Sequence, residues 1–368
     1  MKKKEIAIII RNFDSSSGGA EKYCVELTNL LTKKYCVHLF CQSFNSSNKK
    51  ITIHKIPKFF EKPRFLNLIL FSIFSRIATR KYNIVHSHDM VSHANINTIH
   101  VPCVKTNLSN LKGIHKYFYL IKSLFSPRIL SYLWLERQQM KNKIIAVSRL
   151  TQENIFLNYP SQRNKIKIAR PGLGRTFIDI KTNLRSKEIE NCNLPQNSFT
   201  FLFAAHGFER KGLDSVINAL SILDKENVHL IVAGRGEKKY HKKSFRNIHF
   251  IGSIEKMENI YSNVDALIHP TLGDTFGMSV LEAMSFSLPV IVSSPQYCGL
   301  SYELSEKEVI FIENPRDAKE IKEKIDMLVS NDKLRKKLSI EARKKALEFS
   351  WKNTMLQTID SYNELLGG

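Results

Sequence analysis

Short apolar runs alternate with stretches of helical periodicity along the whole chain. Residues 5–10 form the first run, and Ala20, Tyr23, Cys24 and Leu27 follow with the i, i+3, i+4, i+7 spacing of an amphipathic helix. Runs of β-branched residues that alternate with helices are typical of parallel sheets whose strands are connected by helical crossovers. The pattern therefore predicts an α/β protein.

The expected strands fall into two sets, separated by the hinge-like segment Arg170-Pro-Gly-Leu-Gly174. The first set comprises residues 5–10, 37–41, 83–86, 97–100 and 144–147. The second set comprises residues 199–205, 228–233, 248–251, 266–269, 290–293 and 309–312, and helices are expected over 318–329, 332–348 and 351–366. We predict two similar domains facing a cleft, with ligands at the carboxyl ends of the strands.

The two halves of the chain differ strongly in net charge. Lys and Arg number 56 against 34 Asp and Glu, a net charge of +22. Residues 1–171 carry 29 basic and 8 acidic side chains, net +21, and residues 172–368 carry 27 and 26, net +1. A field of this kind attracts anions, which leaves nucleic acid, an anionic membrane and a phosphorylated substrate as candidate partners.

Cysteine spacing and hydropathy argue against a disulfide-rich or metal-binding protein, a signal peptide and a membrane-spanning helix. The six cysteines show no CxxC or metal-ligand spacing, which is typical of reduced residues in a cytosolic protein. The N-terminal apolar run ends at Arg11 and reads as a buried strand rather than a signal peptide. Residues 65–74 are the most hydrophobic stretch, far shorter than the roughly 20 residues of a membrane-spanning helix. No transmembrane segment is expected.

The first candidate loop joins the first strand to the first helix. Gly18 and Gly19 allow a ligand to approach the backbone, and the helix that begins near Ala20 offers free N–H groups to an anion. The alternative is an ordinary capped βα turn, because the loop matches neither GxGxxG nor a Walker motif.

The second candidate loop follows the strand at residues 199–205. Arg210 and Lys211 lie where a diphosphate at the strand ends could be bound, Arg through its planar fork and Lys as a point charge. Two cations at a helix start oppose the helix dipole, which favours a function over a solvated surface pair.

The third candidate loop contains two carboxylates eight positions apart. Asp274 follows the strand at 266–269, and Glu282 lies about one turn inside a helix that is expected to start near Met278. Both can accept hydrogen bonds from sugar hydroxyls. As an alternative, Asp274 is a turn former and Glu282 an ordinary helix residue.

Taken together, these segments and the late Phe349-Ser-Trp351 resemble the retaining GT-B glycosyltransferases of family four, most of all the bacterial lipopolysaccharide core glucosyltransferases. The resemblance implies a GT-B fold of two Rossmann-like domains. Residues 1–171 would be the membrane-facing, acceptor-binding domain and residues 172–348 the donor-binding domain. Residues 349–368 would form a helix that returns to the first domain.

The resemblance also implies roles for residues. Glu282 would bind the ribose of a nucleotide-sugar donor, and Asp274 with the backbone of Phe276, Gly277 and Met278 would hold the transferred hexose. The family usually has glutamate where this chain has Asp274.

The remaining implied roles concern the diphosphate, the base and the sugar. Arg210 and Lys211 would neutralise the leaving diphosphate, and Gly19 would lie beneath it. Gly18 would belong to the same donor-binding turn. The family likeness places Gly234 and Gly236 near the base and His100 beside the sugar.

The implied reaction moves a hexose, most simply glucose from a UDP-sugar, to a lipid-linked or lipopolysaccharide-core saccharide with retention of configuration. Cations and amide donors directed at the departing phosphate would stabilise the transition state. We expect no metal and no cofactor besides the donor, because the sequence contains no Asp-x-Asp pair and no cluster of residues at metal-ligand spacing.

Basic and aromatic residues alternate between residues 104 and 143, which is typical of an element lying on anionic lipid. The side chains assigned to membrane or acceptor contact are Lys112, Lys116, Tyr117, Phe118, Lys122 and Trp134. Residues 57–81 have a similar, more apolar character. We therefore expect a cytoplasmic protein attached peripherally to the inner face of the membrane, whose acceptor is an anionic, lipid-linked or phosphorylated saccharide.

Three other functions stay open from the sequence. They are a catalytically silent membrane-bound partner in polysaccharide assembly, an epimerase or phosphorylase of the same fold, and a basic nucleic-acid-binding protein. The last is disfavoured because no helix-turn-helix, zinc-finger or RNP-like signature is present, so no nucleic-acid partner is expected.

Overall fold

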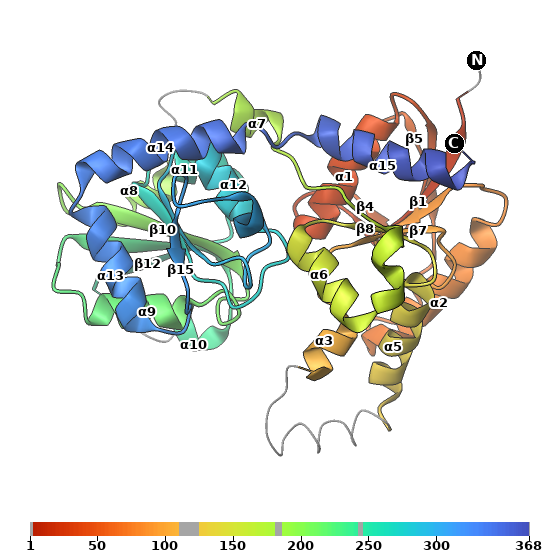
Figure 1. Ribbon diagram of the computed structural model, residues 1–368, viewed down its shortest axis with the longest axis horizontal. Helices are drawn as coiled ribbons and strands as arrows, with labels where there is room; N and C mark the ends of the chain where they lie inside the picture. The colour runs from red at the N-terminus through yellow and green to blue at the C-terminus, as the bar shows by residue number, and fades with distance from the viewer. Residues whose placement is uncertain (1–2, 110–124, 181–185, 242–245, 368) are drawn as a thin grey trace. The chain divides into compact units, whose positions relative to one another are not determined.

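The chain forms two compact units, each built on a parallel sheet (Figure 1). The structure is a computed structural model that describes residues 3–109, 125–180, 186–241 and 246–367. Unit 1 consists of Met1–Gly172 and Trp351–Gly368, and unit 2 of Leu173–Ser350. The C-terminal segment therefore belongs to the same unit as the N-terminus.

Unit 1 contains a seven-stranded sheet in the order β5-β3-β1-β6-β7-β8-β9, in which every pair is parallel. Its strands are β1 (Glu5–Ile9), β3 (Cys36–Cys41), β5 (Ile51–Lys55), β6 (Val85–Ser87), β7 (Ile96–Ile99), β8 (Lys143–Ala146) and β9 (Ile166–Ile168). The short strands β2 (Asn12–Phe13) and β4 (Ser43–Phe44) pair separately. The helices are α1 (Gly19–Leu31), α2 (Arg64–Ala78), α3 (Val104–Ser109), α5 (Pro127–Gln139), α6 (Arg149–Asn158) and α15 (Trp351–Leu365), with a 3-10 turn η1 (Pro160–Lys165).

Successive residues of β1 enter different cores, as the pleat of a strand requires. Ile6 and Ile8 pack with α1 and α15, whereas Ala7 and Ile9 pack with Phe71 of α2. The sheet is thus covered on both faces, and burial on both faces explains why the central strand β1 is apolar at every position from Ile6 to Ile9.

Unit 2 contains a six-stranded parallel sheet in the order β12-β11-β10-β13-β14-β15. Its strands are β10 (Phe199–His206), β11 (Val228–Arg235), β12 (Ile248–Gly252), β13 (Ala266–His269), β14 (Val290–Ser293) and β15 (Ile310–Ile312). Its helices are α7 (Arg175–Ile178), α8 (Lys187–Glu190), α9 (Leu213–Ser221), α10 (Lys238–His241), α11 (Met257–Tyr261), α12 (Met278–Ser285), α13 (Ala318–Val329) and α14 (Asp332–Ala346), with a 3-10 turn η2 (Leu300–Glu303).

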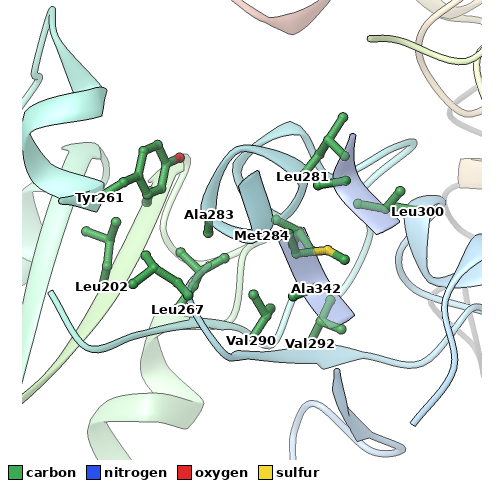
Figure 2. Packing of buried hydrophobic residues seen from close by; sticks show 14 of the residues in the cluster. Leu202, Tyr261, Leu267, Leu281, Ala283, Met284, Val290, Val292, Leu300 and Ala342 are labelled. Atoms are coloured by element: carbon green, nitrogen blue, oxygen red, sulfur yellow. The ribbon is translucent and has the colours of Figure 1, made fainter. Parts of the chain in front are cut away.

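The same alternation divides the core of unit 2. Phe201 and Phe203 of β10 pack with α9 and α13, and Leu202 packs in a second cluster with α12 and α14. Figure 2 shows this second cluster, in which Met284 of α12 lies close to Ala342 of α14 above the strand that carries Val290 and Val292. Unit 2 is therefore a sheet between two helical layers, with the strand order of a doubly wound dinucleotide-binding fold.

The structure confirms the predicted α/β class and all the strands that the apolar runs predicted, within two residues at either end. Two strands of the main sheets were missed, as were the two-residue strands β2 and β4. β5 lies at the edge of its sheet and has a buried residue only at Ile51, so its sequence lacks a continuous apolar run. β9 has three residues, too few to give a recognisable period. Within the described residues, no helix is both long and apolar enough to span a membrane.

A buried histidine links the C-terminal helix to the sheet of unit 1. His86 in β6 has one ring nitrogen, Nδ1, 2.7 Å from the Tyr362 hydroxyl of α15 and the other, Nε2, 2.7 Å from the Thr98 hydroxyl of β7. Burial, with a smaller contribution from His100, lowers the pKa of His86 from 6.5 to about 3. The imidazole is consequently neutral in the folded protein at neutral pH.

We predict that unit 1 loses stability between pH 7 and pH 5. The unfolded chain protonates His86 near pH 6.5 and the folded chain only near pH 3, so the unfolded state binds more protons between these values. His86 alone then accounts for a loss of about 2 kcal/mol in the free energy of unfolding. Both tryptophans, Trp134 and Trp351, belong to unit 1, so denaturant unfolding followed by tryptophan fluorescence reports on this unit.

The matched control is His86→Asn, which removes the titrating group. The difference in unfolding free energy between pH 7 and pH 5 should be smaller in this variant by about 2 kcal/mol. An unchanged difference would show that His86 does not couple to the stability of unit 1.

Candidate active site

The candidate site of unit 2 lies where the order of its strands reverses. β10 and β13 are neighbours in the sheet although β11 and β12 come between them in the sequence. The loop from β10 to α9 and the loop from β13 to α12 both leave from the carboxyl ends of these two strands. Such a switch point is where doubly wound sheets bind ligands.

Backbone contacts hold the two loops together. Gly212 has φ of +83°, and a Cβ at this position would overlap the carbonyl oxygen of Pro270 in the other loop. The amide of Leu272 donates to the carbonyl of Arg210 at 3.0 Å, and the Arg210 guanidinium donates to the carbonyl of Gly273. The two loops therefore act as one structural element.

Lys211, Asp274 and His269 meet between these loops. The Lys211 ammonium forms an ion pair with Oδ2 of Asp274, although the two residues are 63 positions apart. Nε2 of His269 lies 3.1 Å from the same oxygen. Only 7% of Lys211 is exposed, so its charge is largely removed from water. The sequence placed Lys211 on a ligand diphosphate, whereas in this structure it neutralises a carboxylate.

Asp274 is ionised in this environment. Burial by itself raises the pKa of its carboxyl, but the charge of Lys211 and then the hydrogen bond from His269 outweigh burial and hold it well below its usual value. Burial lowers the pKa of His269 in turn, against the opposing effect of Asp274. The imidazole is therefore neutral at neutral pH and donates to the carboxylate.

The start of α12 follows directly after Asp274. Gly277 caps the helix in the left-handed region at φ of +104°, and the Phe276 amide donates to Oδ1 of Asp274 at 3.3 Å. The Asp274 backbone bonds to a neighbouring loop, with its N–H 2.7 Å from the Tyr297 carbonyl and its carbonyl 2.9 Å from the Gly299 N–H. The N-terminal turn of α12, beginning at Met278, is thus fixed beside the carboxylate.

Glu282 lies one turn further along α12 and is 8% exposed. Its Oε2 accepts a hydrogen bond of 3.1 Å from the hydroxyl of Tyr261 in α11. Burial and then the Glu282 charge raise the pKa of Tyr261 well above its ordinary value, so the phenol stays protonated and acts as a donor.

At the positions of Gly234 and Gly236, any larger residue would overlap neighbouring atoms. A Cβ on Gly234, at φ of +121°, would overlap the carbonyl oxygen of Ala205 in β10. A Cβ on Gly236 would overlap the ring of Phe208. Their predicted place near a nucleotide base stays a prediction.

A cavity of about 510 Å³ opens beside Arg210 on unit 2. It is lined by Glu209, Arg210, Gly212, Asp214, Ser215, Glu237, Leu272 and Arg316. Of the residues predicted from the sequence, Arg210 alone lines it. Arg210 is also the exposed cation of its loop, so it is accessible to an anion in a way that Lys211 is not.

In unit 1 the glycine turn leads into α1 as expected. Gly18 is the N-cap in an extended conformation, with φ of 168°, and Gly19 is the first helical residue. A Cβ on Gly18 would come within 2.7 Å of Glu21 Oε2, whereas a Cβ on Gly19 meets nothing within 4 Å. The space above Gly19 is therefore open to a ligand within this unit.

The switch point of unit 1 lies between β1 and β6 and holds an ion pair that the sequence did not reveal. The Arg11 guanidinium, which follows β1, donates to Oδ1 of Asp89 at 2.8 and 3.1 Å, and its backbone N–H donates to Oδ2 at 2.6 Å. Asp89 lies two residues after β6. The pair joins the ends of two neighbouring strands.

His100 directly follows β7 and lies in a group of aromatic rings. Its Nε2 is 3.0 Å from Nδ1 of His88, and its ring centroid is 4.9 Å from that of Tyr23. Burial lowers the pKa of His100 to about 4, although Asp89 opposes the shift. His100 is therefore neutral at physiological pH, and its predicted place beside a sugar stays a prediction.

The remaining predicted residues are divided between the described and undescribed parts of the chain. Lys112, Lys116, Tyr117, Phe118 and Lys122 lie outside the described residues. Trp134 is on α5 and has 49% of its surface exposed.

Sequence reasoning missed His269, Tyr261 and His88 as parts of these sites. The sequence did indicate two of them by their position, because His269 ends an expected strand and His88 closely follows one. Polar residues at the carboxyl end of a parallel strand face the ligand-binding edge of the sheet. Tyr261 carried no such signal, since only the packing of α11 against α12 brings it to Glu282.

Family models match both halves of the chain. The model described as "Glycosyl transferases group 1" matches residues 185–345, and the model described as "Glycosyltransferase Family 4" matches residues 17–174. The chain is accordingly a glycosyltransferase of the group 1 family, with the two parallel-sheet, Rossmann-like units of the GT-B fold.

Curated relatives are similar to the chain at low identity. An uncharacterized glycosyltransferase of Methanocaldococcus jannaschii is 25% identical over 309 residues, which cover 78% of this chain and 77% of that protein. The O-antigen biosynthesis glycosyltransferase WclY of Escherichia coli is 24% identical over 230 residues, which cover 58% of this chain and 62% of WclY.

Solved structures share the fold over almost the whole chain. WaaG, a glycosyltransferase involved in lipopolysaccharide biosynthesis, superposes with a TM-score of 0.82 at 18% identity, covering 99% of this chain and 100% of WaaG. HepE of Anabaena in complex with UDP-glucose superposes with a TM-score of 0.76 at 14% identity, covering 98% and 99% of the two chains.

We predict that Gly277→Ala lowers the free energy of unfolding of unit 2 by about 1–3 kcal/mol, because alanine is strained at a positive φ. The new Cβ would also lie 2.8 Å from Cys298 Sγ. The control is Gly273→Ala in the same loop, whose Cβ would meet nothing within 4 Å. Limited proteolysis or denaturant unfolding of both variants measures the difference, and equal stability would contradict the strain argument.

Proposed function

We propose that the protein transfers a hexose, most simply glucose, from a UDP-sugar to a lipid-linked or lipopolysaccharide-core saccharide, with retention of configuration. The observation that carries the proposal is the meeting of Arg210, Lys211 and Asp274 at the strand-order reversal of unit 2. A site for a charged donor needs cations for the diphosphate and acceptors for sugar hydroxyls. Arg210 supplies an accessible cation, and Asp274, held by Lys211, supplies an acceptor.

The relatives support the choice of donor and acceptor. HepE, which shares the fold, binds UDP-glucose in its crystal structure. WaaG acts in lipopolysaccharide biosynthesis and WclY in O-antigen biosynthesis. Saccharides of those surface polymers are the acceptors that we infer for this chain.

The proposed roles follow from the surroundings of each residue. Arg210 is exposed and offers its guanidinium to the leaving diphosphate. Glu282, held by Tyr261, accepts from the ribose hydroxyls. The N-terminal turn of α12 contributes backbone N–H groups and a partial positive charge that favour an anion. Stabilising the charge on the departing phosphate in this way requires no metal ion.

We predict that UDP raises the melting temperature of the protein and that Arg210→Ala and Glu282→Ala reduce this effect. A ligand at about 100 times its Kd adds roughly 2.7 kcal/mol to stability. Loss of a charge-assisted contact at Arg210 should weaken UDP binding about tenfold or more. Isothermal calorimetry with UDP, GDP, ADP and CMP measures the affinities.

Arg246→Ala is the matched control, because the Arg246 side chain is exposed on the same unit and pairs with Glu226 at the surface. Binding of GDP instead of UDP would redirect the donor to a mannose-type sugar. If folded protein binds none of the four nucleotides, or if both site variants bind UDP as well as the wild type does, the proposed donor site is wrong. Product analysis with UDP-glucose separates sugar transfer from epimerisation or phosphorolysis.

We further propose that unit 1 attaches to an anionic membrane through a surface formed by residues 57–81 and 125–141, which contain α2 and α5. α2 and α5 contact each other. Apolar side chains are exposed along this surface, namely Phe59, Phe60, Ile73, Ile77, Phe125, Leu130 and Trp134. An amphipathic surface of this composition suits the boundary between lipid headgroups and acyl chains.

Charge on the same segments is almost wholly basic. Exposed cations are Lys58, Lys62, Arg64, Arg76, Arg80, Lys81, Arg128, Arg137 and Lys141. Of the two acidic residues in these segments, Glu136 is buried and accepts from the Tyr159 hydroxyl at 2.8 Å, and Glu61 pairs with Lys58 at 3.3 Å. The folded chain therefore presents cations and apolar groups together, which is the combination that anionic lipid attracts.

We predict that the protein co-sediments with vesicles containing phosphatidylglycerol and far less with pure phosphatidylcholine. Ile77→Glu should lower the bound fraction several-fold, since it places a negative charge on the binding surface. Ile340→Glu is the control, because Ile340 is comparably exposed, 67% against 55% for Ile77, but lies on unit 2. Equal binding to both kinds of vesicle, or equal loss in the two variants, would exclude the proposed surface.

A further inference from the structure

The imidazole of His269 is fixed by the sheet rather than by a loop. His269 is the last residue of β13, which lies between β10 and β14, and only 1% of it is exposed. Its backbone carbonyl accepts from the Thr271 N–H at 2.9 Å, and its Nε2 lies 3.1 Å from Oδ2 of Asp274. A group on a buried strand end holds its partner with better precision than a group on a loop.

The contact with Asp274 determines which nitrogen of His269 carries the proton. An ionised carboxylate only accepts, so the proton is on Nε2 and Nδ1 is bare. Nδ1 is buried and has no hydrogen-bond partner among the residues that the structure describes. The ring therefore serves one described polar contact, the one to the carboxylate.

Two donors share one carboxylate oxygen. Lys211 and His269 both contact Oδ2, whereas Oδ1 accepts only from the Phe276 N–H, at 3.3 Å, among the described residues. An ammonium on a flexible stem can pair with either oxygen of a carboxylate, because it is a point charge without a preferred direction. The directional N–H of His269 removes this freedom and leaves a lone pair of Oδ1 for another donor.

The shorter side chain of Asp274 suits this arrangement. A glutamate at the same position would carry its carboxylate one methylene further from its own backbone, and the distance to the fixed imidazole would change. The aspartate and the histidine at the strand end are thus complementary in length.

We propose that His269 is a positioning residue. It orients the Asp274 carboxylate so that Oδ2 stays on Lys211 and Oδ1 is presented to a hydroxyl of the donor sugar. The inference rests on the proposed function, since it concerns how one carboxylate of the donor site is held.

The test uses His269→Gln, His269→Leu and Asp274→Ala, together with the double variant His269→Leu/Asp274→Ala. Glutamine can place an N–H where Nε2 lies, and leucine fills similar space without a donor. Calorimetry with UDP and with UDP-glucose separates the nucleotide from the sugar, and UDP release from UDP-glucose measures turnover. His269→Asn, whose amide cannot reach the Nε2 position, replaces the leucine variant if the latter does not fold.

We expect His269→Leu to bind UDP within about twofold of wild type but to lose about tenfold or more in UDP-glucose affinity or turnover, because a hydrogen bond to a charged group is lost. We expect His269→Gln to retain most of the wild-type UDP-glucose affinity and turnover. In the Asp274→Ala background, His269→Leu should have no further effect, because His269 acts through Asp274. Wild-type behaviour of His269→Leu, or effects that multiply in the double variant, would overturn the inference.

A measurement without ligand separates the two proposals. In protein labelled with 15N-histidine, the His269 signal, assigned by its loss in His269→Gln, should show the Nε2–H tautomer, and Asp274→Ala should change it. The Nδ1–H tautomer, or no change on removal of Asp274, would reject the positioning role even if UDP binds. Conversely, failure of the wild type to bind any nucleotide would reject the proposed function while this signal still reports the contact.

Discussion

Parallel strands impose the constraint from which both sites follow. Every strand of the two main sheets is parallel to its neighbours, so each connection must cross a face of the sheet and both faces are covered by helices. All carboxyl ends then lie at one edge of each sheet. In unit 2 this brings Lys211 and Asp274 into contact across 63 residues of chain, and in unit 1 it brings Arg11 to Asp89 across 78. The polar groups at each edge are joined by topology rather than by closeness in sequence.

Burial of charge gives the two cations of unit 2 different properties. Lys211 is enclosed with Asp274, and removing a buried ion pair from water is costly unless each charge keeps its partner. The ammonium and the carboxylate therefore hold each other and tie the two loops together. Arg210 contacts a backbone carbonyl, so its positive charge is not cancelled by that contact. Among the described residues, Arg210 is consequently the cation of this loop whose charge no carboxylate neutralises, and it lines the neighbouring cavity.

The strands could be predicted wherever burial on both faces required an uninterrupted apolar run. Residues 199–205 and 290–293 are examples, and the structure confirms them as β10 and β14. Prediction failed at β5, an edge strand that is buried little. It also failed to connect His269 with Asp274 or Tyr261 with Glu282, although three of these four residues stood in segments already singled out. A side-chain contact depends on rotamers and on helix packing, and neither leaves a periodic trace in the sequence.

The sequence by itself determined the α/β class, the two sets of strands and the excess of positive charge in the first half, because each depends on local composition or period. The glycine turn before α1 and the carboxylates around α12 were likewise visible as motifs. Only the tertiary structure decided that Lys211 is paired rather than free, that Glu136 is buried and leaves α5 basic, and that His269 shares an oxygen with Lys211. These outcomes depend on which groups burial removes from water, and burial is a property of the packed fold rather than of any segment.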